Sequence, residues 1–155
     1  MAKWLLKSEP DVFSYDDLVR AKREGWDGIR SYQSRNYLRE MRRGEQAIYY
    51  HSNAKPPGVA GICKIVKTAE PDPTQFDPKS PYHDPKATPD APRWLHVDVK
   101  LVRKTRLLSL AEMRRQPALA TMQVLARGNR LSITPVTPAE WKFVLALADK
   151  PAPAG

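Results

Sequence analysis

Two short apolar runs in the sequence pass directly into polar side chains, with no turn residue between. Residues 46–53 read Gln-Ala-Ile-Tyr-Tyr-His-Ser-Asn, so an apolar run ends in side chains that can stack or hydrogen-bond. Residues 4–6 likewise lead into Lys7-Ser8-Glu9-Pro10. Strands that deliver polar groups to one place are a usual way to build a small rigid pocket. We therefore expect a concave site formed by both segments.

Aromatic side chains recur beside hydrogen-bonding ones elsewhere in the chain. Trp26 precedes Gly28 and Arg30, and tyrosines flank Gln, Arg and Asn side chains within residues 32–37. Planar rings stack on nucleobases, while amide and hydroxyl groups read base edges. Core packing is the alternative for each ring taken singly. Together with a basic surplus, the combination favours a pocket for a nucleotide or base.

Length and charge limit the possible classes of protein. With 155 residues the chain is about one domain long, and its 26 basic against 17 acidic residues give a net charge of +9. That charge favours a polyanionic partner, although a merely soluble basic surface is the alternative. The single cysteine, Cys63, excludes an intramolecular disulfide and fits a reducing compartment. No apolar run reaches the length of a membrane span, so we expect a cytoplasmic or nucleoid-associated protein with no membrane partner.

Residues that could catalyse a reaction or bind a metal are poorly arranged for it. His51, His83, His96 and Cys63 show no metal-binding spacing, and no glycine-rich phosphate loop occurs, so we expect no metal, no cofactor and no catalytic residue. The nuclease-like carboxylates and lysine within residues 71–79 lie among prolines, where no rigid strand would hold an ion. For His51, a satisfied core group and a pocket wall remain equal alternatives.

Hydrophobic periodicity predicts the elements that must position these groups. We expect strands at 4–6, 46–52, 59–67 and 95–103, a strand fragment at 131–133, and helices at 34–41, 110–115 and 137–148. A further helix begins at Ser14 and ends at Gly25, followed by a loop over 26–30. Seven prolines within 71–92 predict an extended loop held by Phe76, Tyr82 and Trp94. This pattern indicates an α+β fold with a curled, mainly antiparallel sheet able to close into a small barrel.

Several ordered blocks of the chain resemble the EVE domain family over residues 3–148. The blocks are 4–10, 26–30, 35–38, 50–53, 76–82, 93–94, 97–99 and 127–132. The resemblance implies a PUA-like fold, a curved and mainly antiparallel β-barrel flanked by short helices. It also implies one EVE domain over residues 1–150, which leaves 151–155 as a flexible C-terminal tail.

The resemblance further implies a non-catalytic module that flips a modified base, such as a methylated or hydroxymethylated cytosine, into its pocket. Some relatives would prefer RNA. Matching the blocks gives the base-pocket candidates Lys7, Ser8, Trp26, Gly28, Asn36, His51, Ser52, Asn53 and Ser132, with Tyr82 and Trp94 at the rim.

Our hypothesis is that Trp26 stacks on an extruded base of modified DNA, with RNA as the alternative. The polar edge of that base would meet Ser8, Asn36, His51 and Asn53, and flanking phosphates would meet Arg30, Arg35, Arg127 and Arg130. Flipping costs a few kcal/mol and stacking returns about 1 to 3, so phosphate contacts must contribute as well. An RNA-binding module, a base-processing enzyme such as a glycosylase with Glu9 as its base, and a small-molecule or protein interaction module remain alternatives.

Overall fold

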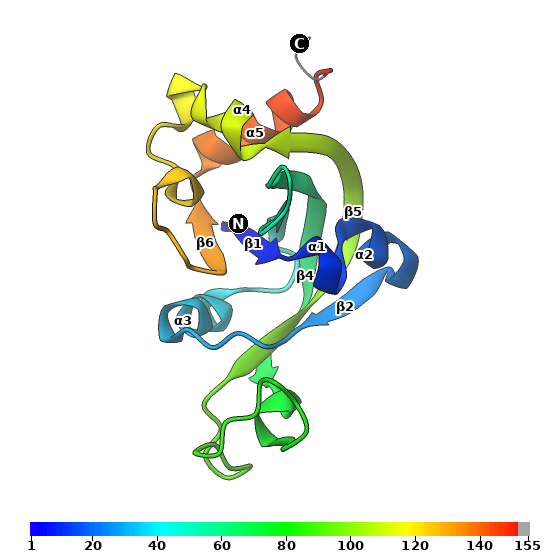
Figure 1. Cartoon of the computed structure of the whole chain (residues 1–155), viewed down its shortest axis with the longest axis vertical. Coiled ribbons are helices and arrows are strands. Elements are labelled where there is room, and N and C mark those ends of the chain that lie inside the picture. Colours follow the sequence, from blue (N-terminus) through cyan, green and yellow to red (C-terminus); the bar gives the residue numbers. More distant parts are fainter. Residues whose placement is uncertain (152–155) are drawn as a thin grey trace.

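The computed structural model describes residues 1–151 and arranges them around one curved six-stranded sheet (Figure 1). Its strands are β1 (Lys3–Ser8), β2 (Arg23–Trp26), β3 (Gln46–His51), β4 (Gly58–Pro71), β5 (Leu95–Ser109) and β6 (Ile133–Val136). They lie in the order β2-β5-β4-β3-β1-β6, and only β1 and β3 run parallel among these pairs. Within residues 1–151 no ladder joins β2 to β6, so the barrel stays open on that side. The predicted fold class, α+β with a mainly antiparallel sheet, is confirmed.

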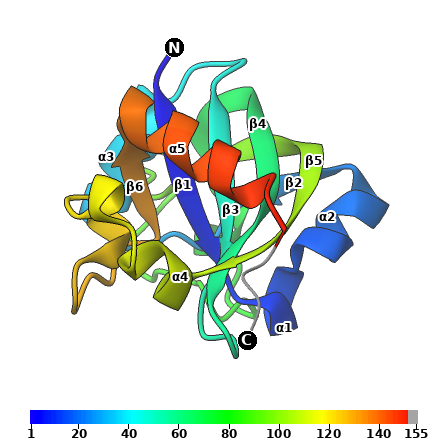
Figure 2. The same ribbon diagram turned by 90° about the horizontal axis from the view of Figure 1, so that it is seen from above.

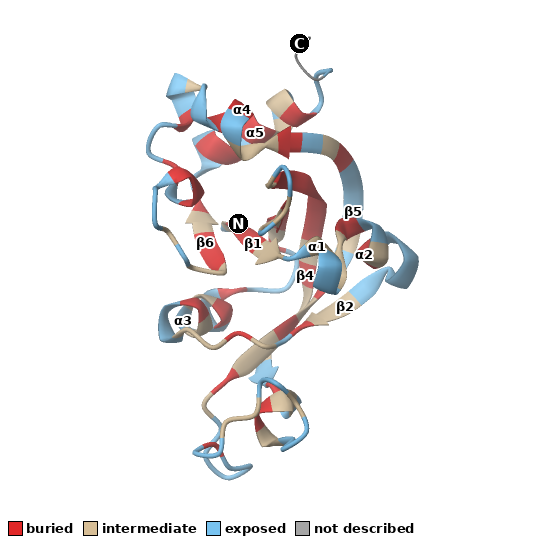
Figure 3. Cartoon of the chain, in the orientation of Figure 1, coloured by how far each residue is buried: buried red, intermediate tan, exposed pale blue. Residues whose placement is uncertain are grey.

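Alternation along the strands divides the buried side chains between two faces of the sheet. Buried residues are red along the ribbon in Figure 3. Trp4 and Leu6 of β1 belong to one apolar cluster, whereas Leu5 belongs to the other. The same split separates Tyr49 from Ile48 in β3. Successive side chains of a strand point to opposite faces, so one sheet supports two cores. The cluster containing Trp4 and Tyr49 is the one that reaches the candidate site described below.

Five α-helices lie around the sheet within residues 1–151. They are α1 (Pro10–Phe13), α2 (Tyr15–Ala21), α3 (Tyr32–Glu40), α4 (Leu110–Arg114) and α5 (Pro138–Ala148). Capping boxes form at Ser14 and Thr137, where each side chain accepts from the backbone N–H three residues on. Buried residues of α5 pack on the face of β1 and β3 that carries Leu5 and Ile48 (Figure 2).

The predicted end of the second helix at Gly25 is wrong. The helix ends at Ala21, and the next residue, Lys22, caps it with a positive φ of 68°. Gly25 and Trp26 consequently lie in β2, which pairs with β5, and the loop begins only at Asp27. Pairing with a distant strand overrides the local helix-stop signal that glycine gives. The correction matters because it places Trp26 on rigid backbone.

The proline-rich segment follows β4, which runs as far as Pro71, and extends from the sheet at the foot of Figure 1. It is pinned, as predicted. Gln75 is fully buried, and its side chain bonds to the backbone of Asp72, Arg93 and Trp94. These bonds tie the beginning of the segment to its end, so the loop has a fixed shape despite its prolines.

The strands β4 and β5 are longer than the sequence predicts. β5 continues to Ser109, six residues beyond the predicted end, and both strands carry register shifts that let the pair bend. Of the predicted tail, residues 151–155, only Pro151 belongs to the described residues, and it is exposed. Residues 152–155 lie outside the described part of the chain. No helix within residues 1–151 is long and apolar enough to cross a membrane.

Candidate nucleic-acid interface

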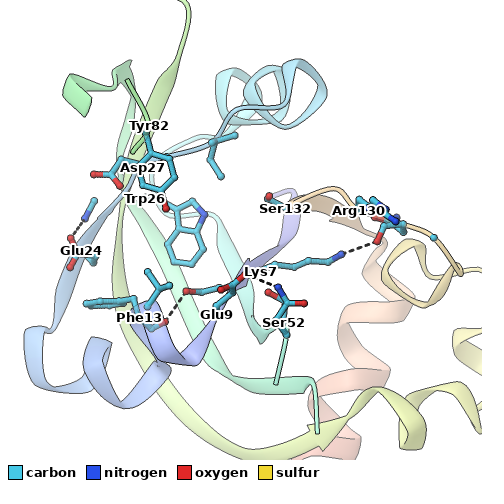
Figure 4. A pocket seen from close by; sticks show the side chains of 18 residues that line it. Lys7, Glu9, Phe13, Glu24, Trp26, Asp27, Ser52, Tyr82, Arg130 and Ser132 are labelled. Atoms are coloured by element: carbon cyan, nitrogen blue, oxygen red, sulfur yellow. Dashed lines mark hydrogen bonds between the residues drawn. The ribbon is translucent and has the colours of Figure 1, made fainter. Parts of the chain in front are cut away.

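A cleft of about 990 Å³ opens at the ends of β1, β2 and β3 (Figure 4). The loop after β2, the proline-rich segment and the loop that contains residues 128–132 complete it. Its lining comprises Lys7, Ser8, Glu9, Val12, Phe13, Glu24, Gly25, Trp26, Asp27, Gly28, Ile29, Ser52, Asn53, Tyr82, Gly128, Asn129, Arg130 and Ser132. The parallel pairing of β1 with β3 aligns Ser8 with His51, which brings the two polar strand ends together. The concave site expected from these two segments is therefore present.

Most of the predicted pocket residues meet in this cleft. The lining includes the pocket candidates Lys7, Ser8, Trp26, Gly28, Ser52, Asn53 and Ser132, the rim candidate Tyr82 and the phosphate candidate Arg130. The remaining candidates do not line the cleft, namely Asn36, His51, Trp94, Arg30, Arg35 and Arg127. Contacts elsewhere in the protein explain the exclusion of all of these except Arg127, which is exposed on the loop that carries Arg130.

Trp26 ends β2 with its indole pointing toward the cleft, between Tyr82 and Phe13 (Figure 4). The residue is only 7% exposed, because the ring packs edge-on against Tyr49 at 5.3 Å and 84°. Tyr49 in turn donates a hydrogen bond from its hydroxyl to the carbonyl of Phe13 at 2.7 Å. The indole is thus held by an aromatic and a backbone contact before any ligand arrives.

Gly28 and Tyr82 form a closely packed wall of the cleft. Gly28 has a φ of +77°, and a Cβ at this position would lie 2.9 to 3.1 Å from atoms of the Tyr82 ring. A Cβ approach under 3.0 Å is essentially never observed, so a larger residue at this position must displace the ring. The backbone at Gly28 therefore allows Tyr82 to lie against the loop that follows Trp26.

Arg30 belongs to an internal network rather than to the cleft surface. Its guanidinium donates to the fully buried Asp72 at 3.1 Å, to Thr74 at 3.0 Å and to the carbonyl of Tyr82 at 2.6 Å. Asp72 also accepts from the backbone N–H of Gly28 at 2.8 Å. The network joins the loop after β2 to the proline-rich segment, so Arg30 positions the wall of the cleft.

Trp94 and Arg35 lie outside the cleft in a stack of planar groups. Trp94 stacks on Tyr32 at 4.9 Å, and the guanidinium of Arg35 lies 4.7 Å from the centre of the Tyr32 ring. Arg35 also donates to the carbonyl of Arg93. This stack fastens the proline-rich segment to α3. Asn36, on the same helix, accepts from Arg35 and has no place in the cleft lining.

His51 has a structural contact that answers the question left open by the sequence. Its Nε2 accepts a hydrogen bond from the backbone N–H of Tyr15 at 3.0 Å, which requires a neutral ring with that nitrogen unprotonated. Burial lowers the pKa of His51, and nearby Lys104 lowers it as well, whereas Asp16 opposes them. His51 thus holds the start of α2 beneath the cleft and does not form its wall.

The lowered pKa of His51 predicts acid sensitivity. The unfolded chain binds a proton at this site more readily than the folded one, so the contribution of His51 to stability is complete above pH about 6.5 and declines below it. Replacing His51 with Gln, which also accepts but does not titrate, is expected to flatten the fall in unfolding free energy between pH 7.5 and 5.5. Denaturant unfolding at each pH, with His83→Gln as the control, measures the slope. Identical slopes for wild type and His51→Gln would contradict the assignment.

Polar groups in the cleft are already partly engaged with one another. Ser8 donates to the carbonyl of Phe13 at 2.7 Å, and the amide of Asn53 donates to Glu9 at 2.6 Å. The ammonium of Lys7 reaches the carbonyl of Asn129 at 3.4 Å, and burial lowers the pKa of Lys7. These contacts fix side-chain directions while leaving the hydroxyl of Ser132 and the exposed guanidinium of Arg130 open to a ligand.

Sequence reasoning missed several lining residues. Val12 and Phe13 are two of them, although an exposed Val12 beside an aromatic residue is itself an unusual surface feature. Glu24 was missed because it lies in β2, where the sequence predicts the end of a helix, and Asp27 falls in the predicted loop that follows. Within residues 1–151 no group of three or more potential metal ligands comes together.

Comparisons with known proteins find similarity over almost the whole chain. The family model described as "EVE domain" matches residues 2–147. Human thymocyte nuclear protein 1 is 45% identical over a match that covers 95% of this chain and 74% of that protein. A crystal structure of a Pseudomonas syringae protein shares 47% identity with a TM-score of 0.92 and covers 95% of this chain and 99% of the other.

A structure of a human protein contains a bound nucleic acid. It is a crystal structure of human THYN1 protein in complex with DNA containing 5-methylcytosine, 44% identical to this chain with a TM-score of 0.91. The match covers 98% of this chain and 100% of that one. With a family model across almost its whole length and relatives above 40% identity, this chain belongs to the EVE domain family.

Proposed function

We propose that this domain binds DNA without catalysis and reads a modified cytosine that leaves the base stack and enters the cleft between Trp26 and Lys7. The observation that carries the proposal is the cleft itself, where an aromatic residue on rigid backbone meets polar strand ends and a basic loop. The human relative bound to DNA containing 5-methylcytosine has the same fold at 44% identity. Protein sites that read a single base combine these same parts.

In this proposal the base lies against Trp26 and Tyr82, and polar groups from Ser8, Ser52 and Ser132 face its edge. The flanking phosphates meet Lys7, Arg130 and the exposed Arg127 of the same loop. Arg30 and Arg35 do not hold phosphates in this proposal, because their guanidinium groups form hydrogen bonds within the protein.

Binding without catalysis is part of the proposal. Glu9 is the carboxylate in the cleft that would serve as a base, but Asn53 donates to it at 2.6 Å. The carboxylate of Glu9 is thus already engaged by a neighbouring amide.

Replacing Trp26 with Leu tests the stacking contact. Leucine fills part of the apolar volume but has no planar ring, so we expect affinity for a duplex with one 5-methylcytosine to fall about 10-fold, as loss of one stacked base would cause. Salt-sensitive binding to unmodified DNA should change little. Fluorescence anisotropy with both duplexes gives the two affinities.

Trp141→Leu is the matched control for this substitution. Trp141 is also buried, at 9% exposed, but it belongs to α5 and packs in the other core, on the opposite face of the sheet. The control variant should lose stability without losing preference for the modified duplex. Equal affinities of wild type and Trp26→Leu for that duplex would show that Trp26 does not stack on the base.

A further inference from the structure

The charges in the cleft are divided between two sides. Glu24 and Asp27 lie on one side of Trp26, while Lys7 and Arg130 lie on the other (Figure 4). The chain as a whole carries a net charge of +9, so carboxylates in this cleft stand out from a basic surface. Phosphate groups are repelled by carboxylates and attracted by ammonium and guanidinium groups. A nucleotide in the cleft therefore directs its phosphates toward Lys7 and Arg130, which leaves its base nearer the acidic side.

The carboxylates of the cleft differ in how far they are engaged. Glu9 accepts from the amide of Asn53 at 2.6 Å, and Glu24 accepts from the backbone N–H of Gly25 at 3.0 Å. Asp27 is exposed, and its carboxylate accepts no hydrogen bond from any residue within 1–151. Asp27 is thus the carboxylate in the cleft with free acceptor capacity for a ligand.

A reader of 5-methylcytosine must reject thymine as well as unmodified cytosine. Thymine carries the same 5-methyl group, so a pocket that detects only the methyl group accepts both bases. The two differ at position 4, where cytosine has an amino group that donates and thymine has a carbonyl oxygen that accepts. Asp and Glu side chains accept hydrogen bonds from the cytosine amino group, whereas a carboxylate repels a carbonyl oxygen. Discrimination requires an acceptor of this kind beside position 4.

We propose that Asp27 determines this specificity by accepting a hydrogen bond from the 4-amino group of the extruded cytosine and repelling the 4-carbonyl oxygen of thymine. The assignment rests on the proposed function, since it takes a base in the cleft as given. It adds the part of the base that is read and the residue that reads it.

Acidification is expected to weaken the discrimination. Partial loss of hydration in the cleft raises the pKa of Asp27, and the neighbouring Asp72 and Glu24 raise it further, against opposing effects of His96 and Arg30. A protonated carboxyl group presents an O–H that donates to the thymine carbonyl. The ratio of affinities for 5-methylcytosine and thymine should therefore be greatest at neutral pH and fall as the pH is lowered through this raised pKa.

Asp27→Asn is the decisive variant. An amide turns either its oxygen or its N–H₂ toward position 4, so it suits both bases. Three duplexes are compared that differ only in the central base, which is 5-methylcytosine, cytosine or thymine. Each central base lies opposite an abasic site, so that pairing energy does not favour one of them. Asp11→Asn removes the same charge from the exposed surface of α1, outside the cleft lining, and serves as the control.

We expect wild type and Asp11→Asn to bind the 5-methylcytosine duplex about 10-fold more tightly than the thymine duplex at pH 7.5, the discrimination that one well-placed base contact gives. In Asp27→Asn that ratio should fall to about 1 to 3 through a gain in thymine affinity. If the wild type prefers 5-methylcytosine to cytosine but Asp27→Asn keeps the wild-type ratio to thymine, this assignment is overturned and the proposed function stands. A wild type that binds all three duplexes equally overturns both.

Discussion

Replacing Asp72 with Asn is expected to lower the free energy of unfolding by about 3 kcal/mol, because it removes one partner of a buried ion pair. The carboxylate is fully buried and accepts from Gly28, Arg30 and Thr74. Burial alone would raise the pKa of Asp72, but these hydrogen bonds outweigh burial and hold the pKa below its usual value. The folded state therefore depends on the ionised carboxylate.

The same substitution should weaken recognition of the modified base. Without Asp72 the guanidinium of Arg30 no longer holds the loop after β2 against the carbonyl of Tyr82, so the cleft wall loosens. Chemical denaturation gives the stability, and anisotropy with the 5-methylcytosine duplex gives the affinity. Asp77→Asn is the matched control, since Asp77 lies in the same segment but is exposed. A loss of less than 1 kcal/mol, equal to that of the control, would show that the network does not hold the two loops together.

Gly28→Ala is expected to lower the free energy of unfolding by about 1 to 2 kcal/mol, because alanine resists the left-handed backbone conformation. It should also lower the affinity for the modified duplex, because the added Cβ moves Tyr82. The φ of +77° accounts for the strain, and the 2.9 Å approach of an added Cβ to the Tyr82 ring accounts for the displacement. Thermal or chemical unfolding measures the first effect, and equilibrium binding measures the second.

Gly128 provides a close control for that experiment. Its φ of +79° is nearly the same, but a Cβ added there meets nothing within 4 Å. The difference in stability between Gly28→Ala and Gly128→Ala therefore isolates the clash with Tyr82, and combining Gly28→Ala with Tyr82→Ala should remove that difference. Equal stability losses in the two glycine variants would mean that Tyr82 does not press on Gly28 in solution.

Local patterns in the sequence predicted most of the fold and the centre of the site. The alternation in β5 and the capping signals at Ser14 and Thr137 act over a few residues, so they are readable without a structure. The polar residues at the ends of two strands, Ser8 and Ser52, also predicted that both segments contribute to one site. The match of ordered blocks to the EVE family extended these patterns to Gly28 and Ser132.

Long-range contacts explain what the sequence concealed. Arg30 looks like any exposed arginine until Asp72, 42 residues away, is found beside it. His51 follows two tyrosines toward the cleft, yet its ring turns to the backbone of Tyr15. Asp27 lies in the cleft because β2 pairs with β5, and no local sequence pattern predicts that pairing. Hydrogen bonds between residues far apart in the sequence thus determine which polar side chains remain free for a ligand.

Equilibrium binding of the wild-type protein to matched duplexes, with a single central cytosine either plain or 5-methylated, tests the central claim most directly. The measurement is made at two salt concentrations, since phosphate contacts weaken with salt and a base contact does not. We predict tighter binding to the methylated duplex at both concentrations, with a ratio that persists at the higher one. Equal and salt-sensitive affinity for the two duplexes would contradict the account, because only the basic surface would then be engaged.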